Sequence, residues 1–178
     1  MGDNRVLIVD SREKWTQPNS TDNHIALYFF KHHIDYTIRK LDCGDYQYDN
    51  DQSVSVDRKK SLDELATNLL NKSDSCRFWR EVRRAHKQGT KLIVLCECGG
   101  GYHNVNDLKY WKSKWSGVSG RRLISEIQRC EYAYGVIFKF CDRRSTGRII
   151  IELLREYGGG SNNAKTKTRD STGGGDAS

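Results

Sequence analysis

The sequence lacks any long hydrophobic run, and this absence excludes whole classes of protein. No stretch approaches the roughly 20 apolar residues that a membrane-spanning helix needs. The amino terminus, Met1 to Arg5, also lacks the long apolar segment of a secretory signal. We therefore expect a soluble, cytoplasmic protein with no membrane partner, whose six cysteines are reduced thiols.

The sequence also lacks the second close pair of cysteines that a structural zinc site usually requires. Such sites place two to four residues between paired cysteines, whereas one residue separates Cys96 from Cys98. A zinc-binding regulatory protein that uses these two cysteines and His103 is an alternative that a metal assay would test. The glycine run at 99–101 lacks the flanking pattern of a phosphate-binding loop, so we expect a connector there.

Positive charge is what the sequence has in excess. Lysine and arginine number 30 against 23 aspartates and glutamates, which gives a net charge of +7. This excess favours a polyanionic partner such as nucleic acid, although a well-solvated basic surface would give the same count. The length of 178 residues fits one ordinary domain.

The hydrophobic pattern alternates between the periods of strands and helices. We expect residues 1–157 to form a single folded domain and the polar, glycine-rich residues 158–178 to be a flexible tail. The expected strands are 6–9, 36–41, 45–48, 54–58, 91–96 and 134–140, and the expected helices are 23–33, 61–70, 76–87, 121–129 and 147–157. Alternation of this kind predicts an α/β fold, a mixed β-sheet flanked by helices.

The segment from Leu41 to Asp63 carries the chemistry. A polar turn at 49–52, centred on Asp51, would place Asp45 opposite Asp57 on antiparallel strands, with Cβ atoms roughly 4.5–5.5 Å apart. Two like charges at that distance repel unless a cation lies between them, and Mg²⁺ prefers such carboxylate oxygens. Strand alternation puts Lys59 on the same face as Asp57 and Arg58 on the other face.

Two carboxylates and a lysine on one face form a plausible phosphodiesterase site. A bound metal can polarise a phosphoryl oxygen and lower the pKa of a bound water, while the lysine orients that water or stabilises developing charge. Asp10, at the end of the first strand, could supply a further carboxylate to the metal, and Arg12 and Glu13 follow it in a loop. The alternative is structural: aspartate after glycine is usually a turn residue, and Asp-Arg-Lys is usually a solvated edge.

At these motifs the chain resembles the nuclease domain of the XPF family, a branch of the restriction-endonuclease-like fold. The family's Asp-x-Arg-Glu corresponds to Asp10–Glu13, and its Gly-Asp-Tyr corresponds to Gly44–Tyr46. Its Glu-Arg-Lys motif, with an aspartate four residues beyond the lysine, corresponds to Asp57–Asp63, and the later apolar strand ends in Glu97. The chain departs from the family at Asp57, which stands where the family has glutamate.

The resemblance implies a DNA endonuclease whose metal ligands are Asp45 and Asp57, with Mg²⁺ or Mn²⁺ as cofactor. It implies that Lys59 is the catalytic lysine. Further catalytic or supporting residues would be Asp10, Arg12, Glu13 and Arg58, with Asp63 acting from the following helix. The implied substrate is branched, flapped or junction DNA in recombination, repair or phage replication. Homodimers are common in the family, and the single-domain architecture resembles small phage- or prophage-encoded members that work inside a bacterial cell.

Two groups of cations could hold the DNA. On the helix at 76–87, Arg77, Arg80, Arg84 and Lys87 lie near one face, which indicates either phosphate contacts or a plain solvated face. Lys109 and Lys112 are interleaved with aromatic residues of segment 110–115, a pattern typical of binding to unpaired bases. The competing interpretation is that a tryptophan of this segment anchors the loop to the core. A non-catalytic DNA-binding module that keeps the nuclease fold is the alternative for the whole protein.

Overall fold

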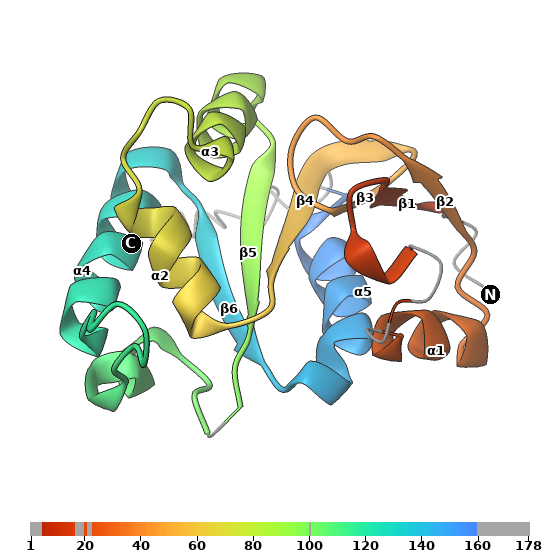
Figure 1. Ribbon diagram of the computed structural model, residues 1–178. Coiled ribbons are helices and arrows are strands. Elements are labelled where there is room, and N and C mark those ends of the chain that lie inside the picture. Colours follow the sequence, from red (N-terminus) through yellow and green to blue (C-terminus); the bar gives the residue numbers. More distant parts are fainter. Residues whose placement is uncertain (1–4, 17–19, 21–22, 100, 160–178) are drawn as a thin grey trace, which may run out of the picture.

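A six-stranded mixed sheet with helices on both faces forms the domain in the computed structural model (Figure 1). The structure describes residues 5–16, 20, 23–99 and 101–159, so most of the predicted tail, 160–178, lies outside the described residues. The strands are β1 (Leu7–Asp10), β2 (Tyr36–Arg39), β3 (Tyr46–Tyr48), β4 (Asp51–Lys59), β5 (Lys91–Glu97) and β6 (Ile137–Cys141). The helices are α1 (His24–Lys31), α2 (Leu62–Leu70), α3 (Arg77–Gln88), α4 (Gly120–Tyr134) and α5 (Thr146–Tyr157), with short 3₁₀ turns η1 (Lys14–Thr16), η2 (Val105–Tyr110) and η3 (Arg143–Ser145).

The strand order is β2-β1-β3-β4-β5-β6, which confirms the predicted α/β class with a mixed sheet. β1 pairs in parallel with β2 and antiparallel with β3, and β3 is antiparallel to β4. β4, β5 and β6 are mutually parallel. Lys59 therefore lies at the carboxyl end of a central strand, where ligands of open α/β sheets commonly bind.

The sheet has a hydrophobic core on each face. On β5, Leu92, Val94 and Cys96 pack with α2, α3 and α4, whereas Ile93 and Leu95 pack with α1 and α5. Figure 1 shows this division, with α1 and α5 on one side of the strands and the other three helices on the opposite side. Covering on both faces explains why β5 reads as an uninterrupted apolar run.

A side-chain cap fixes the start of α2, directly after β4. Ser61 accepts a hydrogen bond from the Glu64 backbone N–H at 3.1 Å, as the predicted capping signal requires. The Glu64 carboxylate accepts a bond from the Lys60 N–H at 2.8 Å. The chain between Lys59 and α2 is therefore short and well held.

The hairpin prediction was wrong about the turn but consistent with the register near Asp45. β4 begins at Asp51, which pairs with Tyr48, so the turn is at 49–50 rather than centred on Asp51. A bulge in β4 then shifts the register, so that Tyr46 pairs with Val56. The bulge, and not the turn, brings Asp45 beside Asp57.

The predicted strand at 134–140 began too early. The α4 helix continues to Tyr134 and ends at Gly135, whose φ of 68° is left-handed, and β6 starts only at Ile137. No helix in the described part of the chain is both long and apolar enough to cross a membrane. All six cysteines lie within the described residues, and each is a free thiol.

Candidate active site

A cavity of about 280 Å³ lies where β4, α3 and the segment after β1 meet. Every residue predicted to be catalytic lines this cavity, whereas Asp10 and Asp63 do not. The lining residues are Arg12, Glu13, Lys14, Asp45, Asp57, Arg58, Lys59, Lys60, Glu64, Asn68, Arg77, Phe78 and Glu81. This set is dominated by charged side chains, which suits a charged ligand better than an apolar one.

Gly44 and Ser55 position Asp45. Gly44 adopts a φ of +69°, and a Cβ at this position would lie 2.2 Å from the Ser55 Oγ, so only glycine fits here. The buried Ser55 Oγ donates to the carbonyls of Cys43, at 2.8 Å, and Tyr46, at 3.2 Å. These bonds hold the loop before β3 against the bulge of β4.

Asp45 is a buried carboxylate with unfavourable neighbours. Its Oδ2 accepts a bond from the Arg58 backbone N–H at 2.8 Å. Burial, and next the negative charges of Asp57 and Glu13, raise the pKa of Asp45 well above its ordinary value. A cation bound beside Asp45 would offset this repulsion.

Lys59 pairs with Asp57 inside the cavity. The Lys59 Nζ donates to Asp57 Oδ1 at 3.0 Å and lies 2.7 Å from Oδ2. Burial opposes the charged ammonium, but the charges of Asp57 and Asp45 outweigh it and raise the Lys59 pKa. Asp57 Oδ2 is fully buried and accepts no hydrogen bond from any described residue, although the ammonium is close. Its charge is balanced by the Lys59 ammonium, which a divalent cation would have to share or displace.

The Arg58 guanidinium lies on the face of β4 opposite to that of Lys59, and it is fully buried. Its Nε donates to Glu97 at 2.6 Å and its Nη1 to Glu13 at 3.1 Å. Although burial opposes the charge, the bond to Glu97 raises the Arg58 pKa. Glu97 also accepts a bond from Thr146 at 2.8 Å and lies 3.1 Å from the His24 Nε2. These contacts favour a role for Arg58 in positioning Glu13 beneath the cavity.

Asp10 positions Arg12 rather than facing the two central carboxylates. It accepts bonds from the Arg12 N–H, Nε and Nη2, at 2.8, 2.6 and 2.9 Å, and from the Leu41 N–H at 2.7 Å. Burial opposes ionisation, but these four bonds lower the pKa of Asp10. Both oxygens of Asp10 thus hold neighbouring groups, and its role as a further metal ligand stays a prediction.

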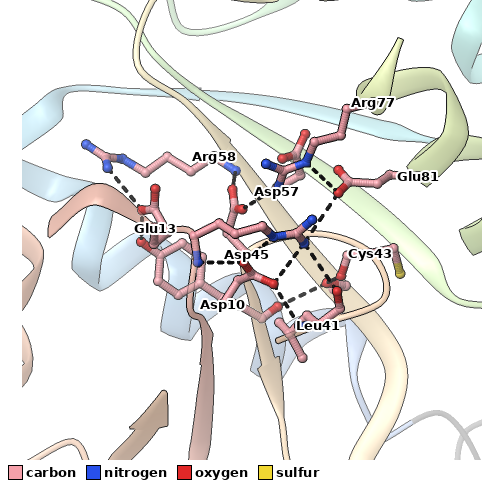
Figure 2. A network of polar contacts seen from close by, with 12 residues as sticks. Asp10, Glu13, Leu41, Cys43, Asp45, Asp57, Arg58, Arg77 and Glu81 are labelled. Atoms are coloured by element: carbon pink, nitrogen blue, oxygen red, sulfur yellow. Dashed lines mark hydrogen bonds and ion pairs between the residues drawn. The ribbon is translucent and has the colours of Figure 1, made fainter. Parts of the chain in front are cut away.

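Glu81 on α3 is a cavity residue that sequence analysis missed. Its carboxylate lies 2.9 Å from the Arg77 Nε and 3.5 Å from the Arg12 Nη2, and it is buried. Burial and the charge of Asp57 raise the Glu81 pKa. Figure 2 shows Asp45 and Asp57 near the centre of the network, with Glu13 on one side and Arg77 and Glu81 on the other. The only sequence signal was one acidic residue on the buried face of an arginine-rich helix.

Asp63 does not line the cavity, and its supporting role from the helix after β4 stays a prediction. Its Oδ1 accepts a hydrogen bond from the Ser113 Oγ, and so it faces the loop that precedes α4. Glu64, the next residue, lines the cavity instead. The helical turn after Ser61 turns position 63 away from the carboxyl end of β4.

The residues present fit a small divalent cation held by two carboxylates. The described part of the chain contains no cluster of three or more His, Cys, Asp or Glu side chains that could hold a metal ion. Mg²⁺ usually keeps several waters and takes only one or two protein carboxylates, with substrate phosphate as a further ligand. Asp45 and Asp57, which both line the cavity, meet this requirement.

The residues of the alternative zinc site lie outside the cavity, as do most of the predicted DNA-contact residues. Cys98 Sγ lies 3.2 Å from the Tyr102 carbonyl, and the His103 side chain is exposed. On α3, Arg80, Arg84 and Lys87 are all exposed, and Arg84 donates to the Asp42 carbonyl. Only Arg77 of this group lines the cavity, 4.0 Å from Asp45. Lys109 and Lys112 are exposed on and beside η2.

Comparisons with known proteins agree with this geometry. The ERCC4 domain matches residues 9–153. The solved structure of XPF from Aeropyrum pernix matches with a TM-score of 0.60 and 19% identity, covering 85% of this chain and 64% of that one. The complex of XPF from Aeropyrum pernix with DNA matches with a TM-score of 0.59 at the same identity and coverage. No curated protein matches the sequence. The chain belongs to the ERCC4 domain family and has the fold of the XPF nuclease domain.

Proposed function

We propose that this protein is an Mg²⁺- or Mn²⁺-dependent endonuclease that hydrolyses DNA phosphodiester bonds. The observation that carries the proposal is the pair of buried carboxylates, Asp45 and Asp57, which line one cavity together with the Lys59 ammonium. A bound divalent cation would be held by Asp45 and Asp57, and it would supply charge neutralisation and a water of lowered pKa. Membership of the ERCC4 family supports a nuclease.

The chain's own residues provide the remaining chemistry. The Lys59 ammonium, fixed by Asp57, is placed to orient an attacking water or to stabilise negative charge developing on the phosphate. Arg12, fixed by Asp10, and Arg77, fixed by Glu81, give the cavity rim two cations that suit phosphate oxygens. Each reactive group thus has a partner that fixes its position before substrate binds.

The proposed substrate is DNA with branched, flapped or junction structure. The net charge of +7 and the exposed arginines of α3 support a polyanionic partner. The Aeropyrum pernix relative is described in complex with DNA, and this chain spans 64% of that chain. We further propose that the protein acts in DNA repair, recombination or phage replication inside a cell, and that it assembles as a homodimer.

A cleavage assay with matched variants tests the proposal. Labelled duplex, flap, fork and four-way-junction DNA are incubated with Mg²⁺, Mn²⁺ or a chelator. Asp45→Asn should abolish cleavage, whereas Asp49→Asn, which changes an exposed aspartate in the turn before β4, should leave it unchanged. DNA binding without cleavage under either metal would instead favour the non-catalytic binding module.

A further inference from the structure

A tightly bonded turn lies between η2 and α4, and we call residues 111–119 the tryptophan turn. A bridge joins Lys112 to Ser119, and the Ser113 N–H donates to the Val118 carbonyl at 2.8 Å. The buried Ser113 Oγ accepts bonds from the backbone N–H groups of Trp115, at 3.2 Å, and Ser116, at 3.0 Å. These bonds give the turn a defined shape.

The two tryptophans of this turn have opposite environments. Trp111 is partly buried and packs against the core formed with α2, α3 and α4. Trp115 is 87% exposed, and the nearby Tyr110 is 82% exposed. Trp111 therefore anchors the loop to the core, as one sequence interpretation expected, whereas Trp115 contributes nothing evident to the core. An exposed tryptophan ring on a turn fixed by these hydrogen bonds is available for contact with a ligand.

The charge around Trp115 is entirely positive in sequence. Segment 109–122 contains five cations and no carboxylate, and its cations are Lys109, Lys112, Lys114, Arg121 and Arg122. The Lys109 Nζ lies 4.7 Å from the centre of the Tyr110 ring. Exposed aromatic rings interleaved with lysines match the chemistry of single-stranded nucleic acid, whose bases stack on rings and whose phosphates attract cations.

The tryptophan turn is attached to the element that follows the catalytic lysine. Its Ser113 Oγ donates to Asp63, in the first turn of α2, four residues after Lys59. In Figure 1 this green-to-teal segment lies beside the start of α2. At about 3.6 Å per residue of extended chain, the backbone of Trp115 lies within roughly 30 Å of that of Lys59. This span is shorter than one turn of duplex DNA, about 34–36 Å.

We propose that Trp115 stacks on an unpaired base of the DNA substrate and so places the single-stranded part within one duplex turn of the cavity. The inference rests on the proposed nuclease function, and it explains how the protein would select DNA that has a single-stranded part. Lys109, Lys112 and Lys114 hold the adjacent phosphates. Asp63 acts through Ser113 as a positioning residue, which explains why a carboxylate at this position does not line the cavity.

Intrinsic tryptophan fluorescence tests the base contact without any cleavage. Trp15 and Trp79 are buried, at 6% and 7% exposure, and Trp111 is partly buried, so Trp115 is the tryptophan most accessible to the oligonucleotide. Titration with an oligothymidylate in a chelating buffer should quench its emission, and Trp115→Phe should remove the quenchable part. No quenching by the oligonucleotide would overturn the proposal. Because no metal is present, this result stands even if the protein proves not to be a nuclease.

Binding measurements with matched variants test the substrate choice. Trp115→Ala should weaken binding to single-stranded and forked DNA by roughly 5- to 150-fold, the range expected for removal of one base-stacking ring. Binding to blunt duplex should change less than twofold. The control is Tyr132→Ala, which removes an aromatic ring that is 95% exposed on α4 beside Glu131 rather than among lysines. Equal weakening by the two variants, or equal weakening on blunt duplex, would overturn the proposal.

A positioning readout separates Asp63 from a merely structural residue. Asp63→Ala should leave the thermal midpoint within a few degrees of wild type but lower the fork preference as Trp115→Ala does. If wild type cleaves forks, its cuts should fall within about ten base pairs of the junction, and Trp115→Ala should spread them. Unchanged fork preference in Asp63→Ala would overturn the coupling between the turn and α2.

Discussion

Repulsion between the buried carboxylates of Asp45 and Asp57 should destabilise the metal-free protein. Replacing Asp45 by neutral asparagine should relieve this repulsion and so raise the stability. At about 5 Å, two like charges repel by roughly 3 kcal/mol when the effective dielectric constant is about 20. Lys59 offsets part of this repulsion, so Asp45→Asn should raise the free energy of unfolding by about 1 to 2 kcal/mol. The asparagine oxygen can still accept the Arg58 N–H that Asp45 Oδ2 accepts at 2.8 Å. The thermal midpoint should then rise by about 2 to 8 °C.

The companion variant Asp57→Asn should behave differently. It removes the carboxylate that lies 2.7 Å from the Lys59 Nζ, whereas Asp45→Asn keeps this close ion pair. The difference in Coulomb attraction makes Asp57→Asn less stable than Asp45→Asn by about 2 kcal/mol. Mg²⁺ at ten times its dissociation constant should stabilise wild type by about 1.4 kcal/mol and should have no such effect on either variant.

Thermal unfolding followed by circular dichroism, in chelator and in Mg²⁺, measures the gain in stability from Asp45→Asn, the difference in stability between the two variants and the stabilisation by Mg²⁺.

The pH dependence of stability tests the direction of the Asp45 pKa shift. Burial and the charge of Asp57 raise the Asp45 pKa above its ordinary value of 3.8. Wild-type stability in chelator should therefore fall as pH rises from about 4 through the raised pKa, and Asp45→Asn should remove that fall. The reasoning is refuted if Asp45→Asn is less stable than wild type in chelator, or if Mg²⁺ stabilises it equally.

Three further predictions follow from the same contacts. Lys59→Met should slow single-turnover cleavage by about 10²- to 10³-fold while DNA affinity changes less than threefold, and a smaller decrease in rate would remove Lys59 from the chemistry. Arg58→Met should cost about 3 to 5 kcal/mol in urea unfolding, because Glu13 and Glu97 lose a buried partner, and a cost below about 1 kcal/mol would contradict the network. The double variant Arg80→Ala and Lys87→Ala should bind duplex DNA with a weaker salt dependence. The slope of log affinity against log salt concentration should fall by about 0.9 for each phosphate that is no longer neutralised. An unchanged slope would favour a plain solvated face.

The central site was predictable from sequence because its spacing is local. Asp57 and Lys59 are two residues apart on one strand, so alternation alone puts them on one face, and their contact confirms this. The sequence analysis expected Asp45 to lie opposite Asp57 because of a turn centred on Asp51, but the turn lies at 49–50. The register is nevertheless as expected near Asp45, because a bulge in β4 shifts it. Contacts of Gly44 and Ser55 fix this register, and no turn rule describes them.

Other parts of the site depend on packing between distant segments. Glu81 lies on α3, and it reaches Arg12 only because α3 packs beside the carboxyl end of β4. Asp10 was expected to face the metal, but its oxygens are taken by Arg12 and by the Leu41 N–H from the chain after β2. Side chains that look equivalent in sequence differ here in the partners that packing supplies.

By itself, the sequence determined the α/β class, the resemblance to the nuclease family and the position of Asp57 and Lys59 on one face of a strand, because hydrophobic period, short motifs and short spacings are local properties of the chain. The tertiary structure decided which charged groups meet across long separations: Arg58 with Glu97, Arg12 with Glu81, and Asp63 with Ser113. It also decided that Trp111 is partly buried while Trp115 stays in solvent. Such pairings depend on how helices pack on the sheet, and the spacing of residues along the chain does not contain that information.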